Sequence, residues 1–597
     1  MAERPTNHSD GVVRTTIYSD GSPVNTTLFA LISLYIRKEV NRIGRATLVF
    51  DAGNMPEGEV PESDDDSFAP GKKILINAGY EDNENPVFEG IVISHHLVIE
   101  EGNMSSLRIE CCDYAYPATQ VRRNRIFEKK KDCEAVKQIL GEYPDLTASV
   151  ENTHSKYNEL VQYYCTDWDF ILARADANGQ LVTTERKEIR IGKPDVNAAS
   201  KLKVTYGIDL IAFKGELVAD EQLNSLKATA WDLAKQEVVT VEGAEPTLNK
   251  QGKDTTAGLA RAVGDHQQWC QTDLCADKAS LQAWADAQLL RTGLSRIQGS
   301  CKFTGNHRLL PGDLIELDGL GQRFNGHAFI GWIEHEIKEG EWFTTAGLGL
   351  PNTTITRKPD VMSPPAAGLL PGIQGLHIGK VIKTDSDPTN EYKVQVEIPV
   401  LDSENKTVWA RLSNFWSSRS YGAFFIPDVG DEVVLGFFNN DPCHAVIIGS
   451  MYSSKQPPPY EPEKENNIRA ILTRSKMKLE FQEKDKIITL ETPGKNKIVI
   501  SDKDKKILLE DQNNNKIEMT PDGILIDSAK EIRIKAQTNI LLEAGAGIRQ
   551  NAKANIEMQG VNIEASASAA LTAKGNAKAE LSAAGQTVVK GAMVLIN

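Results

Sequence analysis

Apolar and polar positions alternate with a regular spacing in the C-terminal part of the chain. Apolar residues first fall into pairs two positions apart, as at Ile498 and Ile500. Further on, the first member of each pair recurs every eight residues, at Ile524, Ile532, Ile540, Ile548 and Ile556. A spacing of two puts both side chains on one face of a strand, and the eight-residue repeat stacks each strand and turn on the last. The pattern predicts a β-solenoid and contradicts the heptad of a coiled coil.

An eight-residue rung offers too few inward side chains to enclose a core by itself. A single chain would expose its isoleucines as a long stripe, whereas three identical chains would close a triangular prism. Fully burying one Ile contributes about 2 kcal/mol, so several per chain can hold such a shaft together. We therefore expect a homotrimer. The residues predicted to form its needle core are Ile524, Ile526, Ile532, Ile534, Ile540, Leu542, Ile548, Ile556, Met558, Ile563 and Leu571.

The pattern changes again toward the end of the chain. Residues 565–584 are dominated by Ala and Ser, which allow a thinner shaft, and the last residues are apolar once more. Since a blunt apolar tip is unfavourable in water, we expect a partner protein to cap it. The predicted contacts with that tip protein are Val594, Leu595, Ile596 and Asn597.

The rest of the chain is rich in short strand-like segments. Residues 11–125 contain several, such as 46–50 and 73–77, separated by turn residues, which indicates an antiparallel barrel or sandwich. Helical periodicity is confined to 133–140, the region around 168–172, and 281–291. Residues 375–455 have the length and strand spacing of a small OB-type barrel. The chain thus divides into residues 1–360, a linker at 361–374, a barrel at 375–455, a Pro-rich spacer at 456–476, and a needle at 477–597.

Composition excludes several functional classes. The formal net charge of −15 disfavours nucleic acid as a partner, because phosphate binding depends on clustered Lys and Arg. No apolar run reaches the roughly 18–20 residues of a membrane-spanning helix, and the N-terminus shows no apolar segment of a signal peptide. The cysteines form no CxxC pair, so we expect reduced core thiols at Cys111, Cys112, Cys133, Cys165, Cys270, Cys275, Cys301 and Cys443.

The sequence shows no catalytic or metal-binding motif. His95-His96 and His335-Glu336 lack zinc-ligand spacing, and no phosphate-binding loop or GxSxG motif is present. We therefore expect no cofactor and no enzymatic activity. Two alternatives stay open: a β-solenoid carbohydrate hydrolase or a spike with a hidden lytic site, and a trimeric adhesin fibre. Phe481 is the single aromatic residue after Tyr460, which argues against sugar stacking along the needle.

One motif resembles a known family. The string from Phe425 to Tyr452, followed by the needle, resembles VgrG, the spike of type VI secretion, and the central spike of phage tails. Shorter segments in the first 350 residues, among them Leu310-Pro-Gly-Asp313, resemble the hub of the same family. The motif positions in the barrel are Pro427, Val429, Gly430, Asp431, Gly436, Asp441, Pro442 and Gly449.

The resemblance implies a mainly β protein with β-barrel hub domains, some helices, an OB-fold neck and a trimeric, intertwined β-helix needle. It implies a homotrimer that sits on a hexameric, Hcp-like inner tube, contacts baseplate proteins and carries a PAAR-type tip. It also implies assembly in the bacterial cytoplasm, then release or injection with transient contact to the target membrane. The short spacer leaves no room for a wall-degrading domain, and we expect effectors to be separate proteins. Type VI secretion, an extracellular injection particle and a phage remain open.

Overall fold

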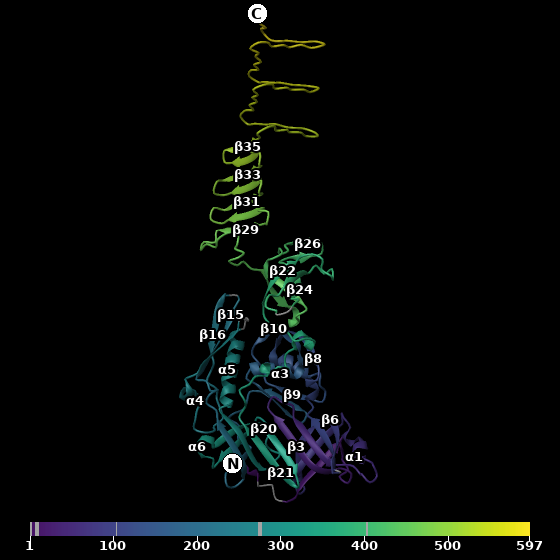
Figure 1. The fold of residues 1–597 in the computed structure, drawn as a ribbon. Helices are drawn as coiled ribbons and strands as arrows, with labels where there is room; N and C mark the ends of the chain where they lie inside the picture. Colours follow the sequence, from purple (N-terminus) through teal and green to yellow (C-terminus); the bar gives the residue numbers. More distant parts are fainter. Residues whose placement is uncertain are drawn as a thin grey trace. The chain divides into compact units, whose positions relative to one another are not determined.

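The computed structural model describes residues 3–5, 11–102, 104–233, 235–272, 277–401 and 404–596. It divides into two compact units, Met1–Met451 and Tyr452–Asn597 (Figure 1). The chain is mainly β, as the sequence predicts. Within the described ranges no helix is both long and apolar enough to cross a bilayer. Cys275 and Asn597, which carry two of the predictions above, lie outside these ranges.

The first unit is built on a thirteen-stranded sheet. Its N-terminal strands are β1 (Val13–Ser19), β2 (Ser22–Pro23), β3 (Ala30–Glu39), β4 (Arg45–Asp51), β5 (Lys73–Tyr80), β6 (Asn83–Glu100) and β7 (Met104–Cys112). The others are β13 (Leu202–Thr205), β14 (Leu210–Leu217), β18 (Ile297–Thr304), β19 (Leu314–Asp318), β20 (Gly326–Lys338) and β21 (Glu341–Leu348). Their order is β14-β18-β21-β20-β3-β4-β7-β6-β5-β1-β2, with β19 joining β13 to β20.

Alternating apolar residues explain why these segments form strands. In β4, Ala46, Leu48 and Phe50 are buried while the residues between them are partly exposed. These side chains belong to a hydrophobic cluster enclosed by β1 and β3–β7, and a second cluster around Phe303 and Ile330 lies in the other half of the sheet. The antiparallel pairing of β3 with β20 joins the two halves into one continuous sheet.

A mixed subdomain is inserted between β7 and β13. It contains β8 (Arg122–Lys131), α2 (Asp132–Leu140), β9 (Thr147–Val150), β10 (Lys156–Thr166), α3 (Asp167–Ala177), β11 (Leu181–Glu185) and β12 (Glu188–Gly192). Thr166 caps α3 by accepting a hydrogen bond from the Asp169 amide at 3.0 Å. Arg174 on α3 bonds Asp132 on α2 at 2.6 Å, which ties the two helices together. Both helices lie where sequence periodicity predicts them.

A second insertion follows β14. It consists of β15 (Ser225–Asp232), β16 (Glu237–Glu242), α4 (Thr256–Val263), β17 (Gln267–Thr272) and α5 (Lys278–Leu294). Asp277 caps α5 by accepting hydrogen bonds from the amides of Ala279 and Ser280, both at 2.9 Å. The short helical segments of the unit are α1 (Pro61–Asp64), η2 (Asp66–Phe68), η3 (Tyr116–Thr119), α6 (Gly321–Phe324), η4 (Ile355–Arg357), η5 (Pro365–Gly368) and η6 (Phe438–Asn440).

Residues 377–450 form a closed five-stranded barrel in the order β22-β23-β24-β28-β27. Its strands are β22 (His377–Lys383), β23 (Val394–Glu397), β24 (Thr407–Leu412), β27 (Glu432–Phe437) and β28 (Ala445–Ser450), and a hairpin of β25 (Ser417–Ser418) and β26 (Tyr421–Gly422) projects between β24 and β27. The interior is filled by aliphatic side chains such as Val396, Leu435 and Ile447. This barrel is the small β-barrel predicted from strand spacing.

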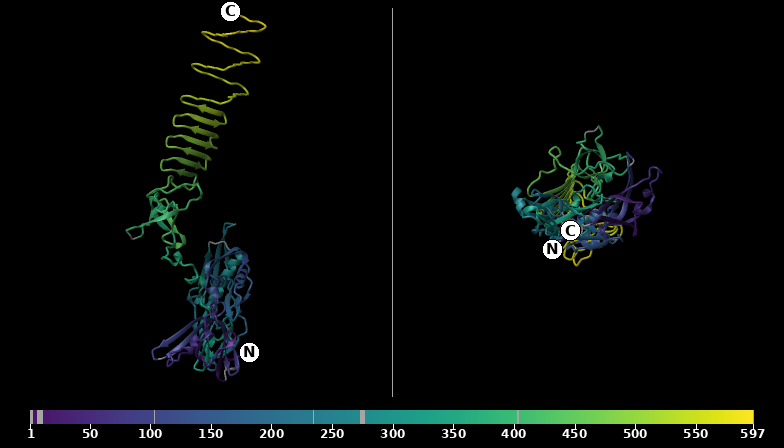
Figure 2. Two further views of the ribbon diagram at one scale, coloured as in Figure 1. Left: turned by 90° about the vertical axis from the view of Figure 1, so that its right-hand side faces the viewer. Right: turned by 90° about the horizontal axis from the view of Figure 1, so that it is seen from below.

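The second unit contains a seven-stranded sheet in which each strand pairs antiparallel with the next along the chain. The strands are β29 (Ile468–Leu472), β30 (Lys478–Gln482), β31 (Ile487–Glu491), β32 (Lys497–Ser501), β33 (Lys506–Glu510), β34 (Lys516–Thr520) and β35 (Gly523–Asp527). Figure 2 shows these strands stacked one after another, followed by wide loops without strands. Residues 468–527 are therefore a hairpin meander, a strand pairing that the two-residue alternation of this region does not specify. Short polar turns reverse the chain after every strand.

Candidate functional site

The sheet of the second unit carries a continuous apolar surface on one face. The antiparallel register places apolar residues opposite each other, for example Leu490 opposite Ile498 and Ile498 opposite Leu509. Repeated over six strands, this pairing builds two parallel columns of side chains. We call this surface the apolar face: Leu479, Phe481, Ile488, Leu490, Ile498, Ile500, Ile507, Leu509, Ile517, Met519, Ile524 and Ile526.

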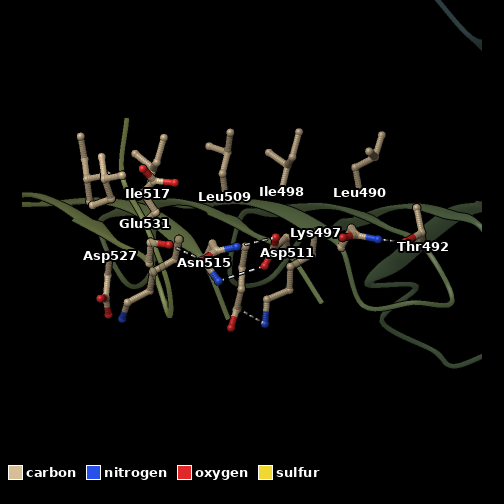
Figure 3. Close-up of a pocket in the computed structure, with 16 residues that line it drawn as sticks. Leu490, Thr492, Lys497, Ile498, Leu509, Asp511, Asn515, Ile517, Asp527 and Glu531 are labelled. Carbon is tan, nitrogen blue, oxygen red and sulfur yellow. Dashed lines mark hydrogen bonds and ion pairs between the residues drawn. The ribbon is translucent and has the colours of Figure 1, made fainter. Parts of the chain in front are cut away.

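The apolar face is uncovered in the single chain. From β31 to β34 its residues are 37–48% exposed. Figure 3 shows Leu490, Ile498, Leu509 and Ile517 standing in a row on the same side of the strands. These four side chains line an open pocket of about 610 Å³. A contiguous exposed patch of this kind marks an interaction site in a soluble protein.

The opposite face of the same sheet carries ion pairs between strands, beside a central row that includes Val499, Leu508 and Leu525. Lys478 lies 3.0 Å from Glu491, and Lys497 lies 2.8 Å from Glu510, each pair on neighbouring strands. The hydrogen bond from Lys497 lowers the pKa of Glu510, and the bond to Glu491 raises the pKa of Lys478. Exposed pairs of this kind add little stability, but they keep this face in water. The sheet therefore has one face suited to solvent and one suited to a partner.

The turns between strands explain the hairpin geometry. Asp511 accepts hydrogen bonds from the amides of Asn513 at 2.8 Å and Asn515 at 2.9 Å, which closes the turn between β33 and β34. Asn514 in that turn and Lys495 between β31 and β32 have positive φ, at 64° and 66°. Asn tolerates this conformation, so the Asn-rich and Pro-Gly-containing turns are signals that could have predicted hairpins.

The residues predicted as the needle core lie mostly beyond this sheet. Ile524 and Ile526 are on β35 within the apolar face, while the others, from Ile532 to Leu571, lie after the last strand and are exposed. From 528 to 596 the structure contains no strand and no hydrogen bond between backbone groups. Backbone N–H and C=O groups need partners once water is excluded, and pairing with other chains would supply them for this segment. The predicted needle core omits the residues before Ile524, although they share the same two-residue alternation.

Three protein-family models match parts of this chain. The model described as "Type VI secretion system/phage-baseplate injector OB domain" matches residues 377–452, which are the closed barrel. The "Phage baseplate V C-terminal trimerisation domain" matches residues 487–563, which include most of the apolar face. The "Alg8 N-terminal domain" matches residues 9–339, more than half of the chain. The chain belongs to the VgrG and phage tail-spike family.

Individual relatives match over different lengths. The type VI secretion spike protein VgrG1b of Pseudomonas aeruginosa is 22% identical over 422 residues, covering 66% of this chain and 55% of that protein. VgrG1a of the same organism is 37% identical over 59 residues, 10% of this chain and 9% of that protein. The chain thus spans about half the length of the first relative and a small part of the second.

Solved structures also match over long stretches at low identity. A tail protein of Neisseria meningitidis is 12% identical with a TM-score of 0.42, covering 59% of this chain and 99% of that one. The Escherichia coli c3393 protein, a type VI secretion component, is 13% identical with a TM-score of 0.36, covering 73% of this chain and 99% of that one.

The VgrG-family barrel motif lies in two tight turns that flank β27. Before β27, the Asp431 carboxylate accepts a hydrogen bond from the Asp428 amide at 2.9 Å, and Gly430, with φ of 99°, donates its amide to the Val381 carbonyl. After β27, Asp441 accepts from the Cys443 amide at 2.8 Å and contacts His444. The remaining motif residues lie within the same turns or on the strands β27 and β28: Pro427, Val429, Gly436, Pro442 and Gly449. The carboxylates of Asp431 and Asp441 thus form the hydrogen bonds that stabilise these two turns.

The predicted tip residues of this VgrG-family chain are open to solvent. Leu595 and Ile596 are 83% and 91% exposed, and Val594 is also exposed. Asn597 lies outside the described residues. The structure therefore shows an apolar terminal segment without a contact that buries it in the single chain.

His335 and His95 both have hydrogen-bonding partners within the chain. His335 is buried with its Nδ1 3.0 Å from Thr344 Oγ1, while His95 contacts Ser63 and the Phe68 carbonyl. Within the described residues no three His, Cys, Asp or Glu side chains gather into a metal-binding group.

Seven of the cysteines lie within the described chain, and all seven are free thiols. Four of them are buried, and burial raises the pKa of Cys112 to about 11, which keeps this thiol protonated and unreactive. The expectation of core thiols is wrong for Cys443, which is exposed because it lies in the turn after β27, and Cys165 and Cys270 are only half-buried.

Proposed function

We propose that this chain is the structural spike of a contractile injection system and that it works as a homotrimer. The observation that carries the proposal is the uncovered apolar face, formed by two columns of side chains along six strands. The trimerisation model that matches residues 487–563 supports the same stoichiometry. Three copies would bring their apolar faces together around one axis and leave the charged faces in water.

The energetics favour this arrangement. Fully burying an Ile or Leu contributes about 2 kcal/mol, and these side chains are about 40% exposed, so each gains roughly 0.8 kcal/mol on assembly. The apolar face then contributes on the order of 10 kcal/mol per chain before the costs of association and ordering are subtracted. Trimer formation also supplies backbone partners for residues 528–596.

The proposed role is mechanical and needs no bond-breaking chemistry. A shaft whose strands pair within and between chains resists bending, and the narrowing Ala- and Ser-rich end reduces its cross-section. In this proposal the hub rests on a hexameric, Hcp-like inner tube within the baseplate, and the tip carries a PAAR-type protein. The trimer assembles in the bacterial cytoplasm and reaches the target membrane when the sheath contracts, with effectors carried as separate proteins.

The names of two relatives support a non-enzymatic role. The relatives VgrG1b and VgrG1a are named as spike proteins. A Vibrio cholerae relative is named an actin cross-linking toxin, but that match covers 58 residues, 5% of that protein.

Sedimentation velocity on the full chain tests the proposal. We expect a species of three times 65.7 kDa for the wild type. The double substitution Ile498→Asn with Ile500→Asn puts polar groups into both columns and should shift the protein to the single-chain mass at low micromolar concentration. Thr489→Asn, on the charged face of the neighbouring strand, is the matched control and should leave the trimer intact. A wild-type chain that sediments as a monomer would rule the proposal out.

A further inference from the structure

The barrel carries a second apolar surface that the needle does not explain. The segment between β24 and β27 contains the β25–β26 hairpin, and we call residues 415–429 the aromatic loop. Its five aromatic side chains are exposed by 84%, 56%, 65%, 85% and 55% in chain order: Phe415, Trp416, Tyr421, Phe424 and Phe425. None of them belongs to the barrel core.

The aromatic loop has a defined shape. Ser417 pairs with Gly422 and Ser418 with Tyr421, and the Ala423 amide donates to the Trp416 carbonyl at 2.9 Å. The rings of Trp416 and Tyr421 meet edge to face with centroids 5.9 Å apart, and those of Phe415 and Phe425 are 6.4 Å apart. The side chains are therefore held in place before a partner arrives, which lowers the entropy cost of docking.

The exposed area is large for a surface that stays in water. At roughly 200 Å² for a full aromatic side chain, the five residues expose on the order of 700 Å². The largest apolar patch on a typical monomer is about 300–600 Å², and a stable interface buries about 800 Å² per partner. The aromatic loop alone thus approaches the size of one side of a protein interface.

A different apolar surface lies on the outside of the same barrel. Neighbouring strands β22, β27 and β28 point aliphatic side chains outward, and we call them the outer strip: Ile378, Val434, Val446 and Ile448. Ile378 and Ile448 are 44% and 53% exposed, while the two valines are half-buried. Gly436 lies beneath Ile448, where a Cβ would come within 3.0 Å of the isoleucine side chain.

A ring of identical copies requires two different contact surfaces on each copy. The aromatic loop and the outer strip are two such surfaces on one barrel. In a threefold ring each subunit contacts its neighbours through two different patches, one on each side, whereas a twofold dimer uses one patch twice. Residues 452–467, which connect the barrel to the first strand of the needle, span at most about 55 Å at roughly 3.4 Å per residue. Barrels whose chains share one needle are therefore held at high local concentration.

We propose that the aromatic loop of each barrel docks on the outer strip of the next copy's barrel, closing a ring of three. This inference rests on the proposed trimer and names a second place where the copies meet. The occupant of the aromatic loop is thus a second copy of this chain, not the tube or an effector.

Site-specific photo-crosslinking of the full chain tests this contact. Phe424 is replaced by benzoylphenylalanine, a change that its 85% exposure should tolerate. Trimers are assembled from equal amounts of ¹⁴N- and ¹⁵N-labelled chains, so that mixed-isotope products identify links between copies. We expect crosslinks between copies from the loop to peptides containing 377–383 or 432–450. The yield should be at least fivefold above that from benzoylphenylalanine at Tyr392, an equally exposed aromatic on another loop of the barrel.

Sedimentation of the same samples separates the possible failures. A trimer whose crosslinks fall within one chain, on residues 1–360 or on a tube protein added to the sample would overturn the barrel contact and leave the needle trimer standing. A monomer without crosslinks between copies would overturn both proposals. Equal yields from Phe424 and Tyr392 would also overturn the contact, because they show proximity without a defined interface.

Discussion

His335 is a buried ionisable residue whose role is structural. It lies on β20 with Thr344 as its hydrogen-bond partner, and its ring is 5.8 Å from that of Trp342. Burial, helped by the positive charges of Lys38 and His307, lowers its pKa to about 3. The folded protein therefore holds this ring neutral at neutral and mildly acidic pH.

This pKa predicts a loss of stability in acid. The unfolded chain takes up a proton near pH 6.5 and the folded chain only near pH 3, so stability is full above 6.5 and falls as the pH drops between these values. At pH 5 the free energy of unfolding should be about 2 kcal/mol lower than at pH 8 from this residue alone. Urea unfolding followed by tryptophan fluorescence at the two pH values measures it.

The variant His335→Gln isolates this contribution. Gln keeps a polar group near Thr344 but does not titrate, so the variant should lose about 2 kcal/mol less than the wild type between pH 8 and pH 5. His96→Gln, at a half-exposed site beside Ser94, serves as the matched control and should keep the wild-type slope. Equal slopes for His335→Gln and the wild type would contradict the prediction.

Individual elements could be predicted where side-chain alternation decides their structure. The segment 46–50 forms β4 and 133–140 forms α2 because each buries one regular set of apolar residues. The pairing of β3 with β20 could not be predicted, since it joins residues about 300 positions apart and no local pattern records it. The two-residue alternation before Ile524 predicts strands but does not record which strands pair, so the hairpin meander could not be predicted from it.

The sequence predicts that the C-terminal region has an apolar face, but it does not show how many strands this face spans. Alternation alone identifies an apolar face at Ile524 and Ile526, and the same rule applies to Ile498 and Ile500 upstream. Which residues pair within the chain depends on the turns, and Asp511 shows this by closing one of them. The aromatic loop could not be predicted from the sequence, because Phe415 and Trp416 are equally compatible with a barrel core.

The boundary at Ser528 predicts two classes of β-structure in the needle. Strands β29–β35 have backbone partners within the chain, whereas 528–596 must obtain them from other copies. In hydrogen-exchange mass spectrometry, 530–590 should be protected in the wild-type trimer and exchange within seconds in the Ile498→Asn, Ile500→Asn variant. Peptides from 30–110 should exchange alike in both proteins, because the hub core lies within one chain. Protection of 530–590 in a monomer would contradict intertwined pairing.

At the scale of the whole molecule, the needle, the barrel and the C-terminal tip each expose apolar surface. In the proposed trimer the first two are buried among identical copies. Leu595 and Ile596 of three chains would form a small apolar platform at the end of the shaft. The proposal is that a PAAR-type tip protein covers this platform, because exposed apolar surface of this kind favours a partner.

The double substitution Leu595→Asp with Ile596→Asp tests this expectation. Six carboxylates would replace the platform and repel both one another and an apolar partner, so binding of a co-expressed PAAR-type protein should fall at least 100-fold. Pull-down followed by quantitative mass spectrometry measures the loss, and sedimentation confirms that the trimer persists. Lys590→Asp, five residues earlier, adds the same kind of charge outside the platform and should leave binding within threefold of wild type. If that control abolished binding equally, net charge and not the apolar platform would be responsible.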